Sequence, residues 1–270
     1  MRGLSDKKLF LLDMDGTLYL DENLFKLVPE FLEHIRSVGR ALFLTNNSSR
    51  GIEGYLAKME RLGIPASAED FLTSVDATVR VLEHEYPGRK CYCFGTRSFE
   101  SQLRSAGIPV TTCLEDGIDI LLCGFDTELT FSKLEDAVKL LNRDVIFLAT
   151  NPDWVCPTAY GYVPDCGSVC EMLWHATGRK PRVIGKPQPD MVELALEKTG
   201  YSADEAVIIG DRVYTDIACG VNAGIDSVFV LSGEGVKEDI EKYGIRPTWI
   251  RKDIAEVYRE IRETNNLPQR

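Results

Sequence analysis

Short apolar segments alternate with amphipathic segments along almost the whole chain. The runs at 8–13, 41–45 and 206–210 are rich in Leu, Ile, Val and Phe. Continuous apolar runs of this length are typical of strands that are buried on both faces. Their alternation with helical patterns predicts βαβ units, and therefore an α/β fold built on a parallel sheet.

The expected elements cover most of the sequence. Strands are predicted at 8–13, 41–45, 90–94, 118–123, 145–150, 182–184, 206–210 and 226–230. Helices are predicted at about 29–38, 52–62, 97–106, 131–141, 168–177, 190–199 and 213–223, followed by terminal helices. Pro29 suits the first turn of its helix, and Gly39 suits the end of that helix.

The order of these elements divides the chain into a core and an insertion. Residues 1–75 and 180–270 have the strand–helix alternation of one core, while residues 76–179 contain a smaller α/β set of their own. Gly, Arg, Lys and Pro at 178–181 are typical of a return linker. We therefore expect a Rossmann-like parallel-sheet core with an inserted α/β cap domain.

Composition excludes several classes of function. The 270 residues have 44% apolar and 27% charged side chains, as in an ordinary globular protein, and a formal net charge of −11. That charge argues against nucleic-acid binding, which needs a positive surface. No segment has the roughly 18 apolar residues of a membrane span. The chain enters its first strand without a signal peptide, so we expect no membrane partner and a cytoplasmic location.

The eight cysteines are scattered and form no Cys-x-x-Cys pair. In a reducing compartment they are most simply interpreted as small buried apolar residues. Cys166 and Cys170 would share one helix face and could bind a metal, but no second pair or nearby His supports that alternative.

Two carboxylates, Asp13 and Asp15, follow the first strand directly. Alternate side chains of an extended segment lie on the same face, so these two can project together while Met14 turns away. Gly16 allows a sharp turn and a close approach to a ligand. A simple Asp-rich turn at the end of a strand is the alternative interpretation.

Three further clusters lie at the carboxyl ends of predicted strands, which is the edge where parallel sheets bind ligands. Thr45, Asn46 and Asn47 follow one strand and suit a phosphate, although Ser48 or Ser49 could also cap the next helix. The other two clusters are Lys186 with Pro187, and Asp211 with Asp216. Carboxylates suit Mg²⁺, with Asp216 orienting a bound water, but Asp216 could equally favour the helix dipole.

In this order the four clusters resemble the motifs of the haloacid dehalogenase-like hydrolase superfamily. The matching segments are Asp13–Thr17, Thr45, Lys186 and Gly210–Asp216. The resemblance covers the whole chain, because the insertion lies where that family has a large α/β cap. Residues 45–48 and 151–153 resemble the branch of NagD-like and p-nitrophenyl phosphatases.

The resemblance implies a Mg²⁺-dependent phosphatase that acts through an aspartyl-phosphate. Asp13 would be the nucleophile and Asp15 the proton donor and acceptor, with Thr45 and Lys186 completing the catalytic set. The metal ligands would be Asp13, Asp211 and the backbone carbonyl of Asp15. The residues that bind the phosphate and the substrate would be Gly16, Thr45, Asn46, Asn47, Asn151, Asp153 and Lys186.

The cap would choose the leaving group. A turn formed by Pro152 alone is the alternative explanation for the 151–153 segment, and Trp154, Tyr160 and Tyr162 could line the pocket or simply pack. The partner implied is a small phosphorylated metabolite, and the family also pairs through the cap, which suggests a homodimer.

Other functions on the same fold fit less well. A dehalogenase needs neither Asp15 nor a metal, and a phosphomutase must shield its phospho-enzyme from water. A phosphotransferase and a catalytically silent phosphate- or phosphoprotein-binding module remain as alternatives. Because a fold does not determine the leaving group, phosphosugars, nucleotides and similar phosphomonoesters all stay open as substrates.

Overall fold

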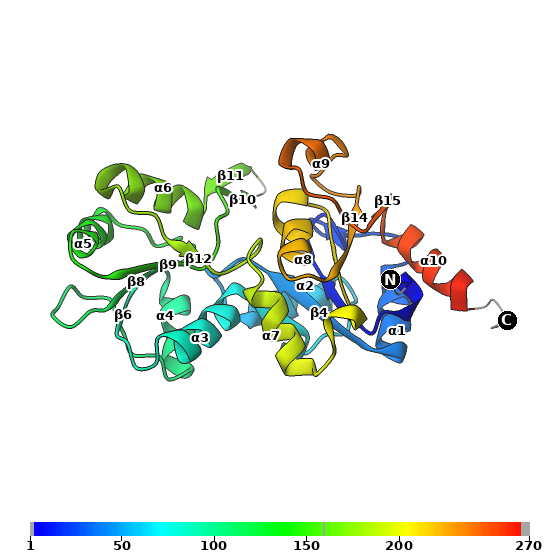
Figure 1. Ribbon diagram of the computed structural model, residues 1–270, viewed down its shortest axis with the longest axis horizontal. Coiled ribbons are helices and arrows are strands. Elements are labelled where there is room, and N and C mark those ends of the chain that lie inside the picture. The colour runs from blue at the N-terminus through cyan, green and yellow to red at the C-terminus, as the bar shows by residue number, and fades with distance from the viewer. Residues whose placement is uncertain (1–2, 159, 266–270) are drawn as a thin grey trace. The chain divides into compact units, whose positions relative to one another are not determined.

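The computed structural model describes residues 3–158 and 160–265, which form two compact units, each with its own parallel sheet (Figure 1). The first unit, called the core below, comprises Met1–Thr45, Tyr55–Leu72 and Lys186–Arg270. The second unit, called the insert, comprises Asn46–Gly54 and Thr73–Gly185.

The core contains a six-stranded sheet in the order β15-β14-β13-β1-β4-β5. Its strands are β1 (Leu9–Leu12), β4 (Arg40–Thr45), β5 (Phe71–Thr73), β13 (Ala206–Gly210), β14 (Asp226–Val230) and β15 (Trp249–Arg251). β1 pairs in parallel with both β4 and β13. Every residue of β1 and β13 is buried, as expected for a parallel sheet covered on both faces. The direction in which strands are added reverses at β1.

Helices cover both faces of the core sheet. They are α1 (Val28–Val38), α2 (Ile52–Arg61), α7 (Asp190–Thr199), α8 (Ala218–Asn222), α9 (Glu238–Tyr243) and α10 (Ile254–Asn265). Figure 1 shows α1 and α10 on one side of the sheet and α7 and α8 on the other. A short hairpin, β2 (Tyr19–Leu20) and β3 (Asn23–Leu24), follows β1, and 3₁₀ turns occur at Leu4–Asp6, Ala68–Asp70 and Ala203–Glu205.

The insert contains a five-stranded sheet in the order β12-β9-β8-β6-β7. Its strands are β6 (Cys91–Phe94), β7 (Val110–Thr111), β8 (Ile120–Cys123), β9 (Ile146–Ala149) and β12 (Arg182–Val183), and its helices are α3 (Ser74–Glu85), α4 (Arg97–Ser105), α5 (Phe131–Leu141) and α6 (Cys166–Thr177). An antiparallel hairpin, β10 (Val155–Thr158) and β11 (Gly161–Pro164), leads into α6. Helices α5 and α6 pack over one apolar cluster with the sheet.

Two local expectations were wrong. The strand expected at 182–184 was assigned to the core, but it pairs with β9 of the insert, with Val183 opposite Ala149. So short a strand has no pattern that identifies its partner. The helix expected at 213–223 begins instead as a π-helical turn, Val213–Ile217, before α8. Turns of this kind are frequent at functional sites.

Six of the eight cysteines are buried. Burial raises the pKa of Cys91 to about 12 and that of Cys219 to about 12, so these thiols stay protonated and unreactive. Sγ of Cys166 lies 4.0 Å from Sγ of Cys170. Among the described helices, none is both long and apolar enough to cross a bilayer.

Candidate active site

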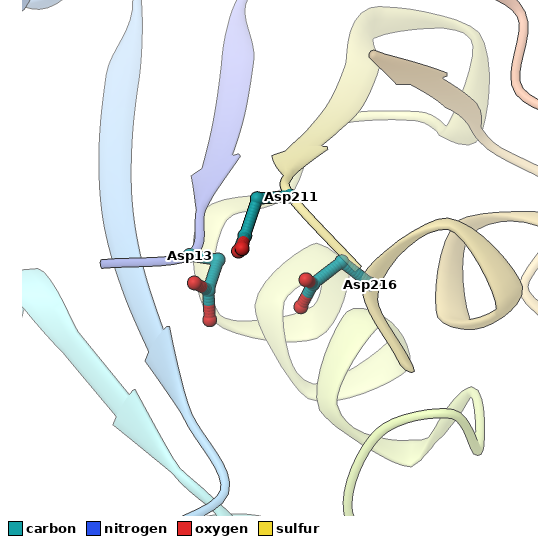
Figure 2. Close-up of side chains that lie close together, drawn as sticks. All are labelled: Asp13, Asp211 and Asp216. Carbon is teal, nitrogen blue, oxygen red and sulfur yellow. The ribbon is translucent and has the colours of Figure 1, made fainter. Parts of the chain in front are cut away.

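Two aspartates lie at the carboxyl ends of neighbouring core strands. Asp13 follows β1, Asp211 follows β13, and Asp216 belongs to the π-helical turn that comes next. One carboxylate oxygen from each of the three lies within 4.8 Å of the others. Figure 2 shows the three side chains converging from these segments. Because the strand order reverses at β1, this edge is where an open α/β sheet binds ligands.

Glycines allow these acids to approach so closely. Gly16 has a φ of 85°, and a Cβ atom at this position would overlap the Asp211 carboxylate. A Cβ atom at Gly210 would overlap the side chain of Asp216. Thr17 then donates its hydroxyl proton to Oδ1 of Asp211 over 3.4 Å. The turn after β1 and the end of β13 therefore interlock only with glycine at these positions.

A loop formed by residues 232–235 holds the Asp211 carboxylate from the other side. The backbone N–H of Glu234 donates to Oδ2 of Asp211 at 2.7 Å, and the Ser232 hydroxyl donates to the carbonyl oxygen of Gly16 at 2.7 Å. Nε of Arg212 lies 3.0 Å from Oε2 of Glu234, which ties the loop to the end of β13. With both oxygens bonded, this carboxylate has a defined orientation.

Lys186 lies between two of the acids. Its Nζ is 2.6 Å from Oδ1 of Asp13 and 2.6 Å from Oδ1 of Asp216, and its side chain is only 4% exposed. Burial lowers the pKa of Lys186, but the attraction of the two carboxylates raises it by more, so the pKa lies above its usual range. The structure thus places one buried ammonium group directly beside Asp13.

Two carboxylates contact this single ammonium and a third, that of Asp211, lies close to both, so the cluster has an excess of negative charge. Burial, followed by repulsion from Asp216, raises the pKa of Asp13 to about 8. The same two causes, in the same order, raise the pKa of Asp211 to about 6. A divalent cation would offset the excess charge, and hard oxygen ligands are those that Mg²⁺ prefers. The donor set therefore fits a divalent cation held by Asp13 and Asp211.

The raised pKa values predict how the metal-free protein responds to pH. Between the unfolded value of 3.8 and the folded value of about 8, folded Asp13 binds a proton that unfolded Asp13 releases. The free energy of unfolding in EDTA should therefore fall as pH rises from 4 to 8. Since one pKa unit corresponds to about 1.4 kcal/mol, we expect a loss of more than about 2 kcal/mol from this group.

Urea unfolding of the wild-type protein and of Asp13→Asn at several pH values measures this effect, because the groups common to both proteins cancel. The variant should lose less stability than the wild type as pH rises. Identical slopes for the two proteins would contradict the raised pKa of Asp13.

The side chain of Asp15 lies apart from this cluster. It is 54% exposed, and its Oδ1 accepts a hydrogen bond from Nζ of Lys58 at 3.3 Å. Its backbone forms a bridge with Tyr19, and Gly16 N–H donates to the Tyr19 carbonyl oxygen at 2.8 Å. A side chain in this position is accessible to solvent.

Thr45 ends β4, the other neighbour of β1, as the sequence predicts. Its hydroxyl lies 3.1 Å from the Tyr55 hydroxyl, so the first turns of α2 contact it. A hydroxyl can both donate and accept a hydrogen bond, so this side chain is of a type that suits a phosphate oxygen.

The other predicted binding residues belong to the insert and contact one another there. Nδ2 of Asn46 donates to Oδ2 of Asp153 at 3.1 Å, and Nδ2 of Asn151 donates to the Asn46 carbonyl oxygen at 2.7 Å. Oδ1 of Asn47 accepts hydrogen bonds from the backbone and the hydroxyl of Ser49. Asn47 therefore shapes its own loop, whereas Asn46, Asn151 and Asp153 form one polar group.

Ser48, expected as a possible helix cap, has a different role. Its hydroxyl lies 3.0 Å from that of Thr150 and accepts the backbone N–H of Phe125 at 2.8 Å. These partners come from distant parts of the insert, and no local pattern around Ser48 indicates them.

Sequence reasoning missed several residues of the site. Tyr55 and Lys58 of α2 contact Thr45 and Asp15, and Glu234 positions Asp211. The three-residue spacing of Tyr55 and Lys58 places both on one helix face, which was a usable signal. Glu234 contacts Asp211 through its backbone N–H, so its residue type gives no indication of this contact.

Comparison with known proteins agrees with this geometry. Residues 10–109 match the haloacid dehalogenase-like hydrolase family, and residues 183–257 match a second, HAD-hydrolase-like family. An acid sugar phosphatase of Staphylococcus aureus is 31% identical over 255 residues, which cover 94% of this chain and 98% of the relative.

Solved structures agree over nearly the whole chain. The 4-nitrophenylphosphatase of Thermotoga maritima has a TM-score of 0.89 and 35% identity, covering 96% of this chain and 98% of its own. NagD of E. coli K-12 has a TM-score of 0.83 and 30% identity, covering 93% and 98%. A glycerol phosphate phosphatase of Mycobacterium tuberculosis, solved with magnesium, has a TM-score of 0.88 and 29% identity, covering 97% and 80%. The chain thus belongs to the haloacid dehalogenase-like hydrolases, in the NagD-like branch, and is a phosphoric monoester hydrolase.

Proposed function

We propose that this phosphatase hydrolyses small phosphorylated metabolites in a Mg²⁺-dependent reaction that proceeds through an aspartyl-phosphate on Asp13. The observation that best supports this proposal is the cluster of three carboxylates, two of which contact one buried lysine. Its surplus negative charge suits a divalent cation, and its Asp13 has a lysine at 2.6 Å. The magnesium complex of the glycerol phosphate phosphatase is consistent with the same choice of metal.

The residues that would hold Mg²⁺ are Asp13 and Asp211, through their carboxylates, and Asp15, through its backbone carbonyl. Asp216 already pairs with Lys186 and accepts the backbone N–H of Arg212 at 3.1 Å, which suits an indirect role through a bound water. When bound, the metal supplies positive charge that offsets the repulsion between a carboxylate and a phosphate dianion.

Lys186 and the donors near the turn after β1 would bind the phosphoryl oxygens. The ammonium of Lys186 would contribute a fixed positive charge beside Asp13, and the hydroxyl of Thr45 and the backbone N–H groups near Gly16 would add hydrogen bonds. Donors held in place in this way stabilise charge that develops on the equatorial oxygens during transfer.

Asp13 would attack phosphorus, and the bond from phosphorus to the leaving oxygen would break as the new bond forms. Asp15 would give its proton to the leaving oxygen, then take a proton from the water that cleaves the aspartyl-phosphate. Splitting hydrolysis into these two displacements makes each one easier. The exposure of Asp15 suits a group that must exchange protons twice.

Substrate choice would depend on the insert. Asn46, Asn151 and Asp153 form one polar group that could bind the hydroxyls of a leaving alcohol. The names of the relatives, acid sugar phosphatase and glycerol phosphate phosphatase, favour polyol or sugar phosphates as the substrate class. A panel of phosphorylated metabolites, ranked by kcat/KM, tests this part of the proposal.

Removal of the metal tests the proposal as a whole. Activity toward 4-nitrophenyl phosphate should fall by more than about 100-fold in EDTA, because several kcal/mol of charge stabilisation are lost. Added Mg²⁺ should restore it. Full activity in EDTA would contradict a metal-dependent enzyme, and no activity in either condition would favour a silent binding module. Transfer of the phosphoryl group to added glycerol in preference to water would indicate a phosphotransferase.

The setting of the enzyme remains a proposal too. We propose a cytoplasmic enzyme that uses a small metabolite and binds neither nucleic acid nor membrane, and the formal net charge of −11 supports the exclusion of nucleic acid. A homodimer formed through the insert is expected from the family, and light scattering coupled to size exclusion measures it.

A further inference from the structure

One face of α2 reaches the segment that follows β1. Nζ of Lys58 donates a hydrogen bond to Oδ1 of Asp15 at 3.3 Å. Within the described residues, this is the one hydrogen bond that the Asp15 carboxylate accepts. Among the described residues, none forms a hydrogen bond or an ion pair with Oδ2 of Asp15. A carboxylate that is 54% exposed would otherwise rotate freely, so Lys58 selects one orientation and leaves the second oxygen available.

A buried aromatic ring holds Lys58 in turn. Its Nζ lies 4.0 Å from the centroid of the Tyr19 ring, and the Tyr19 side chain is fully buried. A cation over the face of a buried ring has a favourable interaction of about 0.5–2 kcal/mol. The backbone carbonyl of Tyr19 also accepts the N–H of Gly16, which follows Asp15 directly. The Tyr19 ring, the Lys58 ammonium and the Asp15 carboxylate therefore belong to one connected set of contacts.

We propose that Lys58 is a positioning residue for the reaction: it holds Asp15 so that its second oxygen can transfer a proton to the leaving group. This inference rests on the proposed role of Asp15 as the proton donor. Proton transfer requires hydrogen-bond reach, and a displacement of about 1 Å can cost as much as 100-fold in rate. Lys58 acts through Asp15, and the contacts described for it include none with Asp13.

Two substrates of nearly the same shape separate positioning from binding. Phenyl phosphate has a poor leaving group that needs protonation, whereas 4-nitrophenyl phosphate has a good one that does not. For Lys58→Met, kcat/KM for phenyl phosphate should fall about tenfold, and that for 4-nitrophenyl phosphate less than about threefold. Methionine is a good helix former of similar length, so α2 should remain folded, which circular dichroism checks.

Two matched variants serve as controls. Lys58→Arg can still donate to Asp15 and should remain within about threefold of the wild type on both substrates. Arg61→Met removes a cation three residues away on α2, whose ion-pair partner is the exposed Glu22 and not Asp15. This variant should leave both rates unchanged.

The outcomes distinguish the inference from the function on which it depends. A rise in KM for both substrates of Lys58→Met, with kcat unchanged, would assign Lys58 to phosphate binding and overturn the positioning role. Equal losses on both substrates would overturn it as well. Asp15→Asn is measured in the same assay: if it has the leaving-group dependence and Lys58→Met does not, the inference fails while the proposed function stands. If Asp15→Asn shows no such dependence, the proposed role of Asp15 fails.

Discussion

Replacing Asp13 by asparagine should abolish turnover, with kcat for 4-nitrophenyl phosphate falling by at least about 10⁴-fold, as for other enzymes that lose a nucleophile. An amide has no charge with which to attack phosphorus, and it offers a poorer ligand to a cation. Asn is nearly the same size as Asp and can still accept a hydrogen bond from Lys186, whose Nζ is 2.6 Å from Oδ1 of Asp13. The geometry around the residue should therefore persist.

Unfolding measurements test whether Asp13→Asn loses activity only because the protein is less stable. Because burial raises the pKa of Asp13 to about 8, an uncharged Asn should be tolerated at this position in the absence of metal. Asp13→Asn should then be at least as stable as the wild type in EDTA at pH 8. A stable, purified variant that keeps wild-type activity would exclude Asp13 as the nucleophile.

Replacing Asp15 by asparagine should slow turnover by about 10² to 10⁴-fold, the range expected when a general acid–base is lost. The effect should be unequal between the two steps. With 4-nitrophenyl phosphate the first step needs little protonation of its leaving group, so the aspartyl-phosphate still forms. The second step needs a base to activate water, so the phospho-enzyme should accumulate.

Intact mass spectrometry after rapid acid quenching measures this intermediate as the added mass of one phosphoryl group. The double variant Asp13→Asn/Asp15→Asn should show none, which ties the modification to Asp13. If Asp15→Asn hydrolyses the substrate slowly without any phospho-enzyme, its defect lies in the first step and the second-step role of Asp15 is wrong.

Much of the fold could be predicted from sequence because strands and helices have different periods. The helices expected at 131–141 and 190–199 and the strands expected at 206–210 and 226–230 are confirmed with the same bounds. Other elements were missed, because the strands of the hairpins β2–β3 and β10–β11 have too few residues for a period to be visible. The partner of β12 was assigned wrongly, because it depends on the path of the segment that returns to the core.

The site shows the same division. Asp13 and Asp211 could be placed at one edge because each follows an apolar strand, and parallel strands end at the same side of a sheet. The contact of Glu234 with Asp211 was not predictable, because it uses a backbone N–H, which every residue type except proline has.

Sequence alone therefore determined that Asp13, Asp211 and Thr45 lie at the ends of core strands of this phosphatase, since local periodicity defines where each strand stops. Tertiary structure alone decided that Lys186 lies between Asp13 and Asp216 and that Lys58 holds Asp15. Such contacts join residues from 30 to 173 positions apart, and packing of separate elements sets their distances. The pattern along a chain encodes the face on which a side chain lies, whereas its partner depends on how those faces meet.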